Sequence, residues 1–461
     1  MRLAGWIAAS IAAAATSFAL AACSSNTPGT GLPIADPLLQ QGASVNQAGT
    51  GSGKISHVVI IIQENRSLDN LFQGFPGANV QSYGYTSTGQ KVTLQPVPLA
   101  LTWDIDHRSA AFYEACDGHG QIPGTHCKMD GFDKEIVTCG VNPPCPNPNP
   151  QYSYVQASDI KPYTALAQQY VLADKMFASN FDVSSYISHQ YIIAAQAGTA
   201  QDYPNDAIWG CDGGPQDTIW TITKQRSLNV KVPVCFDYQT LGDELDAASV
   251  SWKFYTSKYS NTTGGGIWSA YDAVKHIRYG SDWKKVVTPQ TRFFKDVTGG
   301  TLPAVSWVTP TCKNSDHASC DTSHGPQWVA SLVNAVGKSQ YWNSTAIFIM
   351  WDDYGGWYDH VPPPFVDYDG LGLRVPLIVV SPYAKQGYVS HTQYEHGSIL
   401  KFIEDLFGLP RLAPSDTRAN SPAGDCFNFA QAPRAFVPIP TQMHAADFER
   451  EAPDLRPPDN E

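Results

Sequence analysis

Two continuous apolar runs constrain the fold of this 461-residue chain more than any other feature of its sequence. Residues 56–63 and 345–351 each contain an unbroken apolar stretch of strand length. A strand without polar alternation is covered on both faces, as in a parallel sheet between layers of helices. A third run, 374–381, is predicted to be a further core strand, although Pro376 puts its first ladder hydrogen bond in doubt. Helical periodicity appears in three segments: 160–172, 326–338 and 397–407. We therefore predict an α/β fold with a doubly wound, mostly parallel sheet.

Each of the first two runs ends in an adjacent pair of oxygen-bearing side chains. Glu64 and Asn65 follow the first run, and Asp352 and Asp353 follow the second. The carboxyl ends of strands in an open α/β sheet gather at one edge, where ligands bind. Together the four side chains would form an oxygen-only pocket suited to Mg²⁺, Ca²⁺ or Mn²⁺. Taken singly, each pair is equally typical of an ordinary helix cap.

A serine and several histidines are candidates for catalysis. A helix is predicted to begin near Ser185, where free N–H groups and the positive end of the helix dipole would suit a phosphate oxygen. The Ser185 hydroxyl could attack phosphorus if a metal lowered its pKa, although serine is also a common N-cap. His107, His317 and His360 lie among turn residues and could donate to a phosphate or a leaving oxygen, or could be plain surface residues.

The first 53 residues are predicted to contain an export signal followed by a flexible tether. Residues 1–22 combine Arg2, an apolar run and small residues before Cys23, which indicates a secretory signal. The ending at Cys23 resembles the bacterial lipobox, which implies cleavage before this cysteine and lipidation of its thiol. A plain secreted protein is the alternative. Residues 23–53 are rich in Ser, Gly, Pro, Asn and Gln, as expected of a flexible tether. We therefore expect an exported bacterial lipoprotein, held at the outer membrane by its lipid and facing the periplasm or the cell surface.

The charge of the chain narrows the classes of possible partner. The chain has 30 Lys and Arg against 42 Asp and Glu, a formal net charge of −12, and no basic cluster stands out, which argues against a nucleic-acid partner.

Export permits disulfides. Four cysteine pairs are close in sequence: Cys116 and Cys127, Cys139 and Cys145, Cys211 and Cys235, and Cys312 and Cys320. Cys426 would be left over.

Four sequence elements occur in an order that matches a known family. They are the ENRSLD segment at 64–69, the MDGF segment at 129–132, the segment 185–191, and the WDDYGGWYDHVPPP segment at 351–364. Over roughly residues 54–415, the chain resembles the bacterial phosphoesterase family, which joins acid phosphatases with non-specific phospholipases C. The resemblance implies an alkaline-phosphatase-like three-layer sandwich with a central, mostly parallel sheet. We assign residues 54–440 to this catalytic domain and residues 441–461 to a Pro-rich acidic tail.

The resemblance also implies roles for individual residues. The metal ligands of the family fall on the four strand-end residues, and its nucleophile, whose oxygen also touches the metal, falls on Ser185. His107 and His317 match histidines that line the phosphate pocket. One divalent cation is expected, a hard ion such as Ca²⁺, Mg²⁺ or Mn²⁺. The chain departs from the family where Ile187 and Ser188 replace a Pro-Asn pair.

The expected activity is metal-dependent hydrolysis of phosphate monoesters through a phosphoserine, as in acid phosphatases. The alternative within the family is a phospholipase C that cleaves head-group phosphodiesters of phospholipids, although the nucleophile of such enzymes is often Thr. A sulfatase is disfavoured because no cysteine stands in a Cys-x-Pro-x-Arg pattern. An alternative of another class is a non-enzymatic, metal-stabilised surface lipoprotein.

Overall fold

The computed structural model describes four stretches of the chain: residues 49–182, 184–205, 208–258 and 269–454. All of them belong to one compact unit. The predicted signal segment 1–22, Cys23 and the tether up to residue 48 lie outside the described residues. Within the described stretches, none of the helices has the length and apolar character needed to cross a bilayer.

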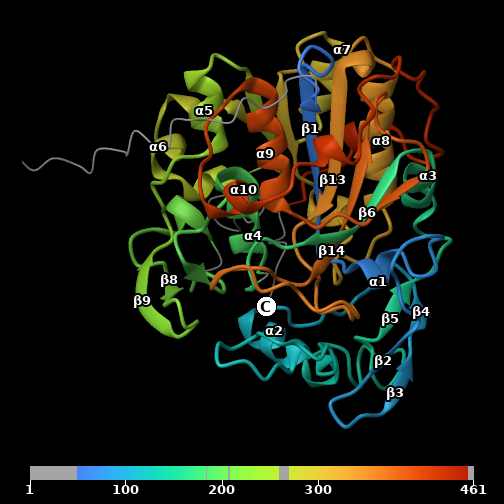
Figure 1. Cartoon of the computed structure of the whole chain (residues 1–461), viewed down its shortest axis with the longest axis vertical. Coiled ribbons are helices and arrows are strands. Elements are labelled where there is room, and N and C mark those ends of the chain that lie inside the picture. Colours follow the sequence, from blue (N-terminus) through green and yellow to red (C-terminus); the bar gives the residue numbers. More distant parts are fainter. Residues whose placement is uncertain (1–48, 183, 206–207, 259–268, 455–461) are drawn as a thin grey trace, which may run out of the picture. The chain divides into compact units, whose positions relative to one another are not determined.

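A nine-stranded sheet runs through the centre of this unit (Figure 1). In order across the sheet the strands are β11 (Val286–Val287), β10 (Trp252–Tyr255), β12 (Val305–Val308), β1 (His57–Gln63), β13 (Thr345–Trp351), β14 (Arg374–Val380), β6 (Val171–Phe177) and β15 (Tyr388–Ser390). The ninth strand, β16 (Tyr394–Glu395), also pairs with β6. β14 runs antiparallel to both of its neighbours, and the other pairings are parallel. The mostly parallel central sheet expected from the sequence is therefore confirmed.

The two apolar runs form the adjacent central strands β1 and β13. All seven residues of β13 are buried, as a strand covered on both faces requires. In β14 the register against β6 shifts between Val375 and Leu377, on either side of Pro376. The shift has a simple cause, because proline has no N–H to donate to the ladder.

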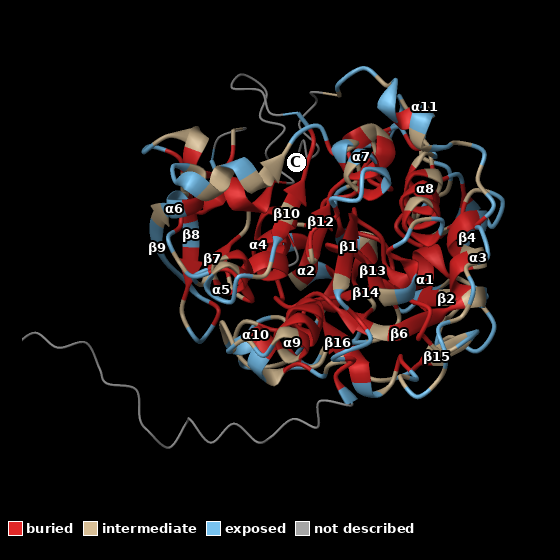
Figure 2. Ribbon diagram, turned by 90° about the horizontal axis from the view of Figure 1, so that it is seen from above, coloured by how far each residue is buried: buried red, intermediate tan, exposed pale blue. Residues whose placement is uncertain are grey.

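Helices cover both faces of the sheet, whose residues are almost entirely buried (Figure 2). One layer contains α3 (Lys161–Gln169), α7 (Arg292–Thr298) and α8 (Gly325–Gly337). The other contains α4 (Ser185–Ala194), α5 (Leu241–Ala247), α6 (Lys275–Arg278), α9 (His396–Phe407) and α10 (Pro414–Arg418). The predicted helices at 326–338 and 397–407 are confirmed as α8 and α9. The prediction of a helix over 160–172 was too long, because the chain enters β6 at Val171 and α3 ends at Gln169.

Shorter elements lie outside the central sheet. They are α1 (Leu68–Leu71), α2 (Ser109–Cys116) and the strands β2 (Tyr83–Tyr85), β3 (Lys91–Thr93), β4 (Gln95–Val97), β5 (Ser153–Val155), β7 (Ala200–Gln201), β8 (Thr218–Ile222) and β9 (Leu228–Pro233). These strands form three small sheets, β2-β3, β4-β5 and β7-β8-β9. Figure 1 shows them below the end of the central sheet at which β1 and β13 finish.

Four disulfides and a C-terminal helix complete the unit. Each of the four cysteine pairs noted in the sequence forms a disulfide, and Cys426 is a buried free thiol. The helix α11 (Ala445–Glu449) lies in the segment 441–461 that we assigned to an acidic tail. It packs on α8, with the Phe448 ring centroid 5.1 Å from that of Trp328. This part of the segment therefore contributes to the core.

Candidate active site

The two strand-end pairs lie side by side at one edge of the sheet. β1 and β13 are neighbours in a register that pairs Gln63 with Trp351, so the residues that follow each strand are adjacent. The backbone N–H of Asn65 donates to Asp352 Oδ1 over 3.0 Å. Glu64, Asn65, Asp352 and Asp353 are all fully buried. The parallel register thus brings together the side chains that the sequence places almost 290 residues apart.

Ser185 faces this cluster from the start of α4. It is the first helical residue, and its Oγ donates to Asp353 Oδ2 over 3.0 Å. The preceding Ser184 occupies the N-cap position, and its Oγ donates instead to Asp182 Oδ2 at 3.0 Å and to the Asp202 carbonyl at 3.2 Å. Of the two serines, Ser185 is the one whose hydroxyl meets the strand-end carboxylates.

His107 holds the side chain of Asn65. Its Nδ1 lies 2.8 Å from the Ile105 carbonyl, and its Nε2 lies 2.8 Å from Asn65 Nδ2. With Nδ1 donating to the carbonyl, Nε2 accepts from the Asn65 amide group. This contact directs the amide oxygen away from the imidazole, and Asn65 Oδ1 accepts no hydrogen bond from the described residues.

His317 is a second buried histidine beside the first. The centroids of the His107 and His317 rings are 6.1 Å apart. On the His317 ring, Nδ1 contacts the Ala318 carbonyl and lies 3.5 Å from Asp104 Oδ2. These contacts hold the ring by one nitrogen, in the manner of histidines oriented for proton transfer.

The carboxylates of the site strongly influence one another. Burial and the charge of Asp352 raise the pKa of Asp353 well above its usual range. Burial acts in the same direction on Asp352, but the hydrogen bond and charge of His189 outweigh it and lower the pKa of Asp352. In the described structure, the basic side chains recorded beside Asp352 and Asp353 are the imidazoles of His189 and His107 rather than a lysine or an arginine. A cation is therefore the natural partner of this cluster.

The donor atoms fit a divalent metal. Asn65 Oδ1 and Asp352 Oδ2 are buried and accept no hydrogen bond from the described residues. Carboxylate and amide oxygens gathered in this way are the ligands of hard cations. The four strand-end residues could therefore hold one ion, with Ser185 beside it.

One residue of the cluster was missed from the sequence. His189 Nε2 lies 3.2 Å from Glu64 Oε1 and 3.6 Å from Asp352 Oδ2. The signal that could have found it is its position four residues after Ser185, which places both side chains on one face of α4. The pocket is therefore not the oxygen-only one that the sequence analysis expected.

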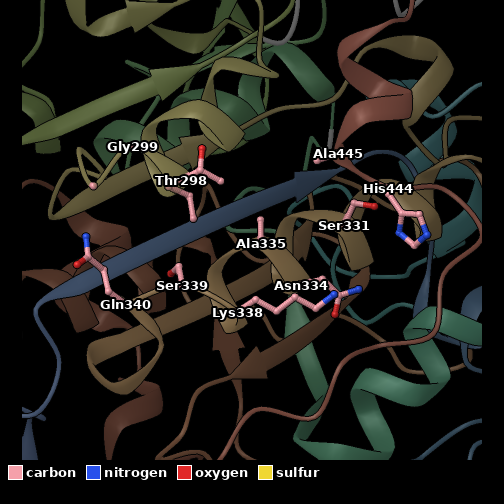
Figure 3. A pocket seen from close by; sticks show the side chains of 12 residues that line it. Thr298, Gly299, Ser331, Asn334, Ala335, Lys338, Ser339, Gln340, His444 and Ala445 are labelled. Carbon is pink, nitrogen blue, oxygen red and sulfur yellow. The ribbon is translucent and has the colours of Figure 1, made fainter.

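His360 lies outside this site. Its Nδ1 is 2.6 Å from Asp69 Oδ2, in a second buried cluster that also contains Asp359 and Arg374. A pocket of about 700 Å³ between α7, α8 and α11 is also separate (Figure 3). Its lining residues include Ser331, Lys338 and His444 but none of the predicted site residues.

Known proteins resemble this chain over most of its length. The sequence model of the Phosphoesterase family matches residues 55–410. Phospholipase C A of Mycobacterium tuberculosis is 27% identical, over 89% of this chain and 85% of the relative. The non-hemolytic phospholipase C of Burkholderia pseudomallei is 25% identical, over 86% of this chain and 62% of the relative. Non-specific phospholipase C1 of Arabidopsis thaliana is 24% identical, over 77% of this chain and 68% of the relative. Among solved structures, the PsFucS1 sulfatase from Pseudoalteromonas sp. aligns with 84% of this chain and 74% of its own at 9% identity and a TM-score of 0.40.

Proposed function

The chain belongs to the phosphoesterase family, and from this premise we propose that it hydrolyses phosphoesters at the buried strand-end cluster with Ser185 as nucleophile. Family membership and the phospholipase C relatives support a phosphoric ester hydrolase. The observation that carries the assignment of the nucleophile is the 3.0 Å contact between Ser185 Oγ and Asp353 Oδ2. It places a hydroxyl at a helix start against the carboxylates that suit a cation.

Glu64, Asn65, Asp352 and Asp353 would hold one divalent ion. When bound, such an ion lowers the pKa of a neighbouring hydroxyl and offsets charge on phosphoryl oxygens. His107 accepts a hydrogen bond from the Asn65 amide nitrogen, which would leave the amide oxygen available as a ligand. The ligand set thus depends on an outer contact as well as on the ligands themselves.

The residues of the chain account for the remaining steps. Ser185 gives its hydroxyl proton to Asp353 Oδ2 and its Oγ attacks phosphorus in line, so that a bond from phosphorus to Oγ forms and the bond to the leaving alcohol oxygen breaks. The backbone N–H groups at the start of α4 stabilise the charge on the phosphoryl oxygens. His317 gives a proton to the leaving oxygen. Water then hydrolyses the phosphoserine and returns one proton to His317, while Asp353 returns its proton to Ser185 Oγ.

We propose a phospholipid head-group phosphodiester as the preferred substrate. This proposal is supported by relatives named phospholipase C that align with most of this chain. A phosphate monoester, as expected from the sequence, remains the second candidate because the nucleophile position holds Ser185 rather than the threonine frequent in phospholipases of the family. Both substrates use the same residues.

A paired assay tests the site and the substrate together. Residues 24–461 are assayed on phosphatidylcholine and on a phosphomonoester, with Ser185→Ala and the matched control Ser184→Ala. We expect diester turnover that falls about 10³-fold or more in Ser185→Ala and is kept in Ser184→Ala. Preferred monoester turnover would support the acid-phosphatase candidate. Activity that survives Ser185→Ala on both substrates would refute the nucleophile.

We also propose that the mature chain is anchored by a lipid on Cys23. The support is the signal-like segment that precedes this cysteine. Metabolic labelling with a fatty acid should mark the full chain and fail to mark Cys23→Ser. Labelling that persists in Cys23→Ser would refute the anchor.

A further inference from the structure

His189 stands in the middle of α4, with only 1% of its surface exposed. Its recorded polar contacts are made through Nε2, which lies 3.2 Å from Glu64 Oε1 and 3.6 Å from Asp352 Oδ2. The other ring nitrogen, Nδ1, is buried and has no hydrogen-bond partner among the described residues. The ring is therefore aimed at two of the strand-end carboxylates.

The spacing of these atoms matches a coordination shell. The ligand atoms of Glu64, His189 and Asp352 all lie within 4.8 Å of one another. Two donors that are each about 2.1 Å from one ion stand about 3.0 to 3.5 Å apart at octahedral to tetrahedral angles. The two distances from Nε2 are close to this range. We infer that His189 coordinates the catalytic ion through Nε2, an inference that rests on the proposed metal-dependent function.

The same geometry changes the kind of ion that the site should prefer. An oxygen-only pocket suits Mg²⁺, Ca²⁺ or Mn²⁺, whereas an imidazole ligand shifts preference toward Fe²⁺ or Zn²⁺. Because His189 and Ser185 are one turn apart on α4, the helix would carry both the nitrogen ligand and the nucleophile. The ion would then fix the position of Ser185 relative to the two strand ends.

Nitrogen coupling to bound Mn²⁺ tests the inference without any measurement of turnover. The wild-type chain is loaded with Mn²⁺, the bound ion is counted by electron paramagnetic resonance, and ¹⁴N coupling is recorded by pulsed methods. The variants are His189→Gln, which keeps an amide of similar reach, and His107→Gln as the matched control. His107 Nε2 is 3.9 Å from Asp353 Oδ2, so it is a second imidazole near the cluster.

We expect an imidazole nitrogen coupling in the wild type and in His107→Gln, and its loss in His189→Gln. Labelling with ¹⁵N-histidine should convert the wild-type ¹⁴N signal to ¹⁵N, which keeps the test valid if His189→Gln fails to fold. The affinity for Zn²⁺ should fall in His189→Gln by at least the 10- to 100-fold that loss of an outer-shell partner typically causes. The affinity for Mg²⁺ should fall less.

Two results would overturn the inference, and they differ in their meaning. Stoichiometric Mn²⁺ without imidazole coupling in the wild type would make His189 an outer hydrogen-bond donor and leave the proposed function standing. Hydrolysis by the wild type that persists after chelation, with no ion bound, would remove the metal-dependent function and this inference together.

Discussion

Two buried acidic clusters in this molecule contain the same residue types but differ in which group neutralises their carboxylates. The site cluster consists of Glu64, Asp352 and Asp353, with His189 beside it. The arginine cluster consists of Asp69, Asp359 and His360, with Arg374 beside it; its carboxylates are fully buried as well. Both have the composition and spacing of a metal site. The difference between them is that Arg374 pairs with the carboxylates of the arginine cluster.

In the arginine cluster, the positive charge is supplied by the Arg374 side chain. Arg374 Nε lies 3.0 Å from Asp359 Oδ1, and its terminal nitrogens reach Asp69 and the carbonyls of Asn79 and Asp174. Burial raises the pKa of Asp359 to about 6, although Arg374 opposes the shift. A guanidinium held by this many acceptors is fixed in place and neutralises its partners permanently. This cluster ties β14 to the segments that follow β1 and β13.

In the site cluster, the side chains recorded as partners of the carboxylates are histidines and a serine hydroxyl. The pKa of Asp353 is raised well above its usual range, with burial and Asp352 as the main causes. A buried carboxylate pair in such surroundings gains most from a mobile cation. The position of one arginine therefore distinguishes a structural cluster from a candidate metal site.

The largest expected effect comes from neutralising one carboxylate of the site cluster. Asp353→Asn removes a proposed metal ligand and the acceptor of the Ser185 hydroxyl, so turnover should fall about 10³-fold or more. The metal-free variant should melt at or above the temperature of the metal-free wild type, because a buried like-charge repulsion is gone. Steady-state kinetics and thermal melts with chelator check both. A variant that keeps its activity would mean that this cluster is structural too.

Removing the fixed cation should break the arginine cluster. Arg374→Met leaves Asp69 and Asp359 buried without their cation, which typically costs about 3–5 kcal/mol of the free energy of unfolding. Chemical denaturation measures the loss, and Arg374→Lys serves as the control that keeps the charge but not the fork of donors. Unfolding at the wild-type denaturant concentration in Arg374→Met would show that the arginine does not stabilise this cluster.

A third group of buried acids is intermediate, because it contains an arginine and one of its carboxyl groups still has a strongly raised pKa. Arg411 lies 2.8 Å from Glu404 Oε2, while burial and the neighbouring Asp416 raise the pKa of Glu404 from its ordinary value of 4.5 to about 10. The folded chain thus keeps a proton that the unfolded chain releases above about pH 4.5, so the free energy of unfolding should fall as pH rises from about 5 to about 10.

Glu404→Gln tests this intermediate case. The amide cannot ionise, so the melting temperature should depend less on pH and exceed that of the wild type by several degrees, roughly 3–6 °C, at pH 9. At pH 4, where the wild-type side chain is protonated in both states, the two proteins should differ little. Melting curves that stay parallel from pH 4 to pH 9 would contradict the buried proton.

The smallest effect is expected at the serine that faces away from the site cluster. Ser184→Ala loses hydrogen bonds to Asp182 and to the Asp202 carbonyl, which should cost about 1 kcal/mol of stability. Turnover should stay within about twofold of the wild type, because Ser184 Oγ makes its recorded contacts with those two residues. A loss as large as that of Ser185→Ala would show that the two serines cannot be separated.

The sequence was sufficient to predict the elements whose character is local. An unbroken apolar run such as 345–351 indicates by its composition alone that the strand is buried. Such runs predicted the central strands and the polar residues that follow them. Close spacing in the chain likewise indicated the four disulfides. These features depend on neighbours in sequence, which is why a single sequence reveals them.

Tertiary structure decided which buried acids share a cation and which side chains meet. Asp353 and Asp359 are six residues apart in one loop, yet one joins Ser185 and the other joins Arg374. His189 contacts Glu64 across 125 residues; its spacing from Ser185 indicates a shared face of α4 but does not indicate which strand that face meets. The physical reason is that the charge environment of a buried carboxylate is set within a few ångströms by strands and helices from distant parts of the chain, and only the packed fold brings them together.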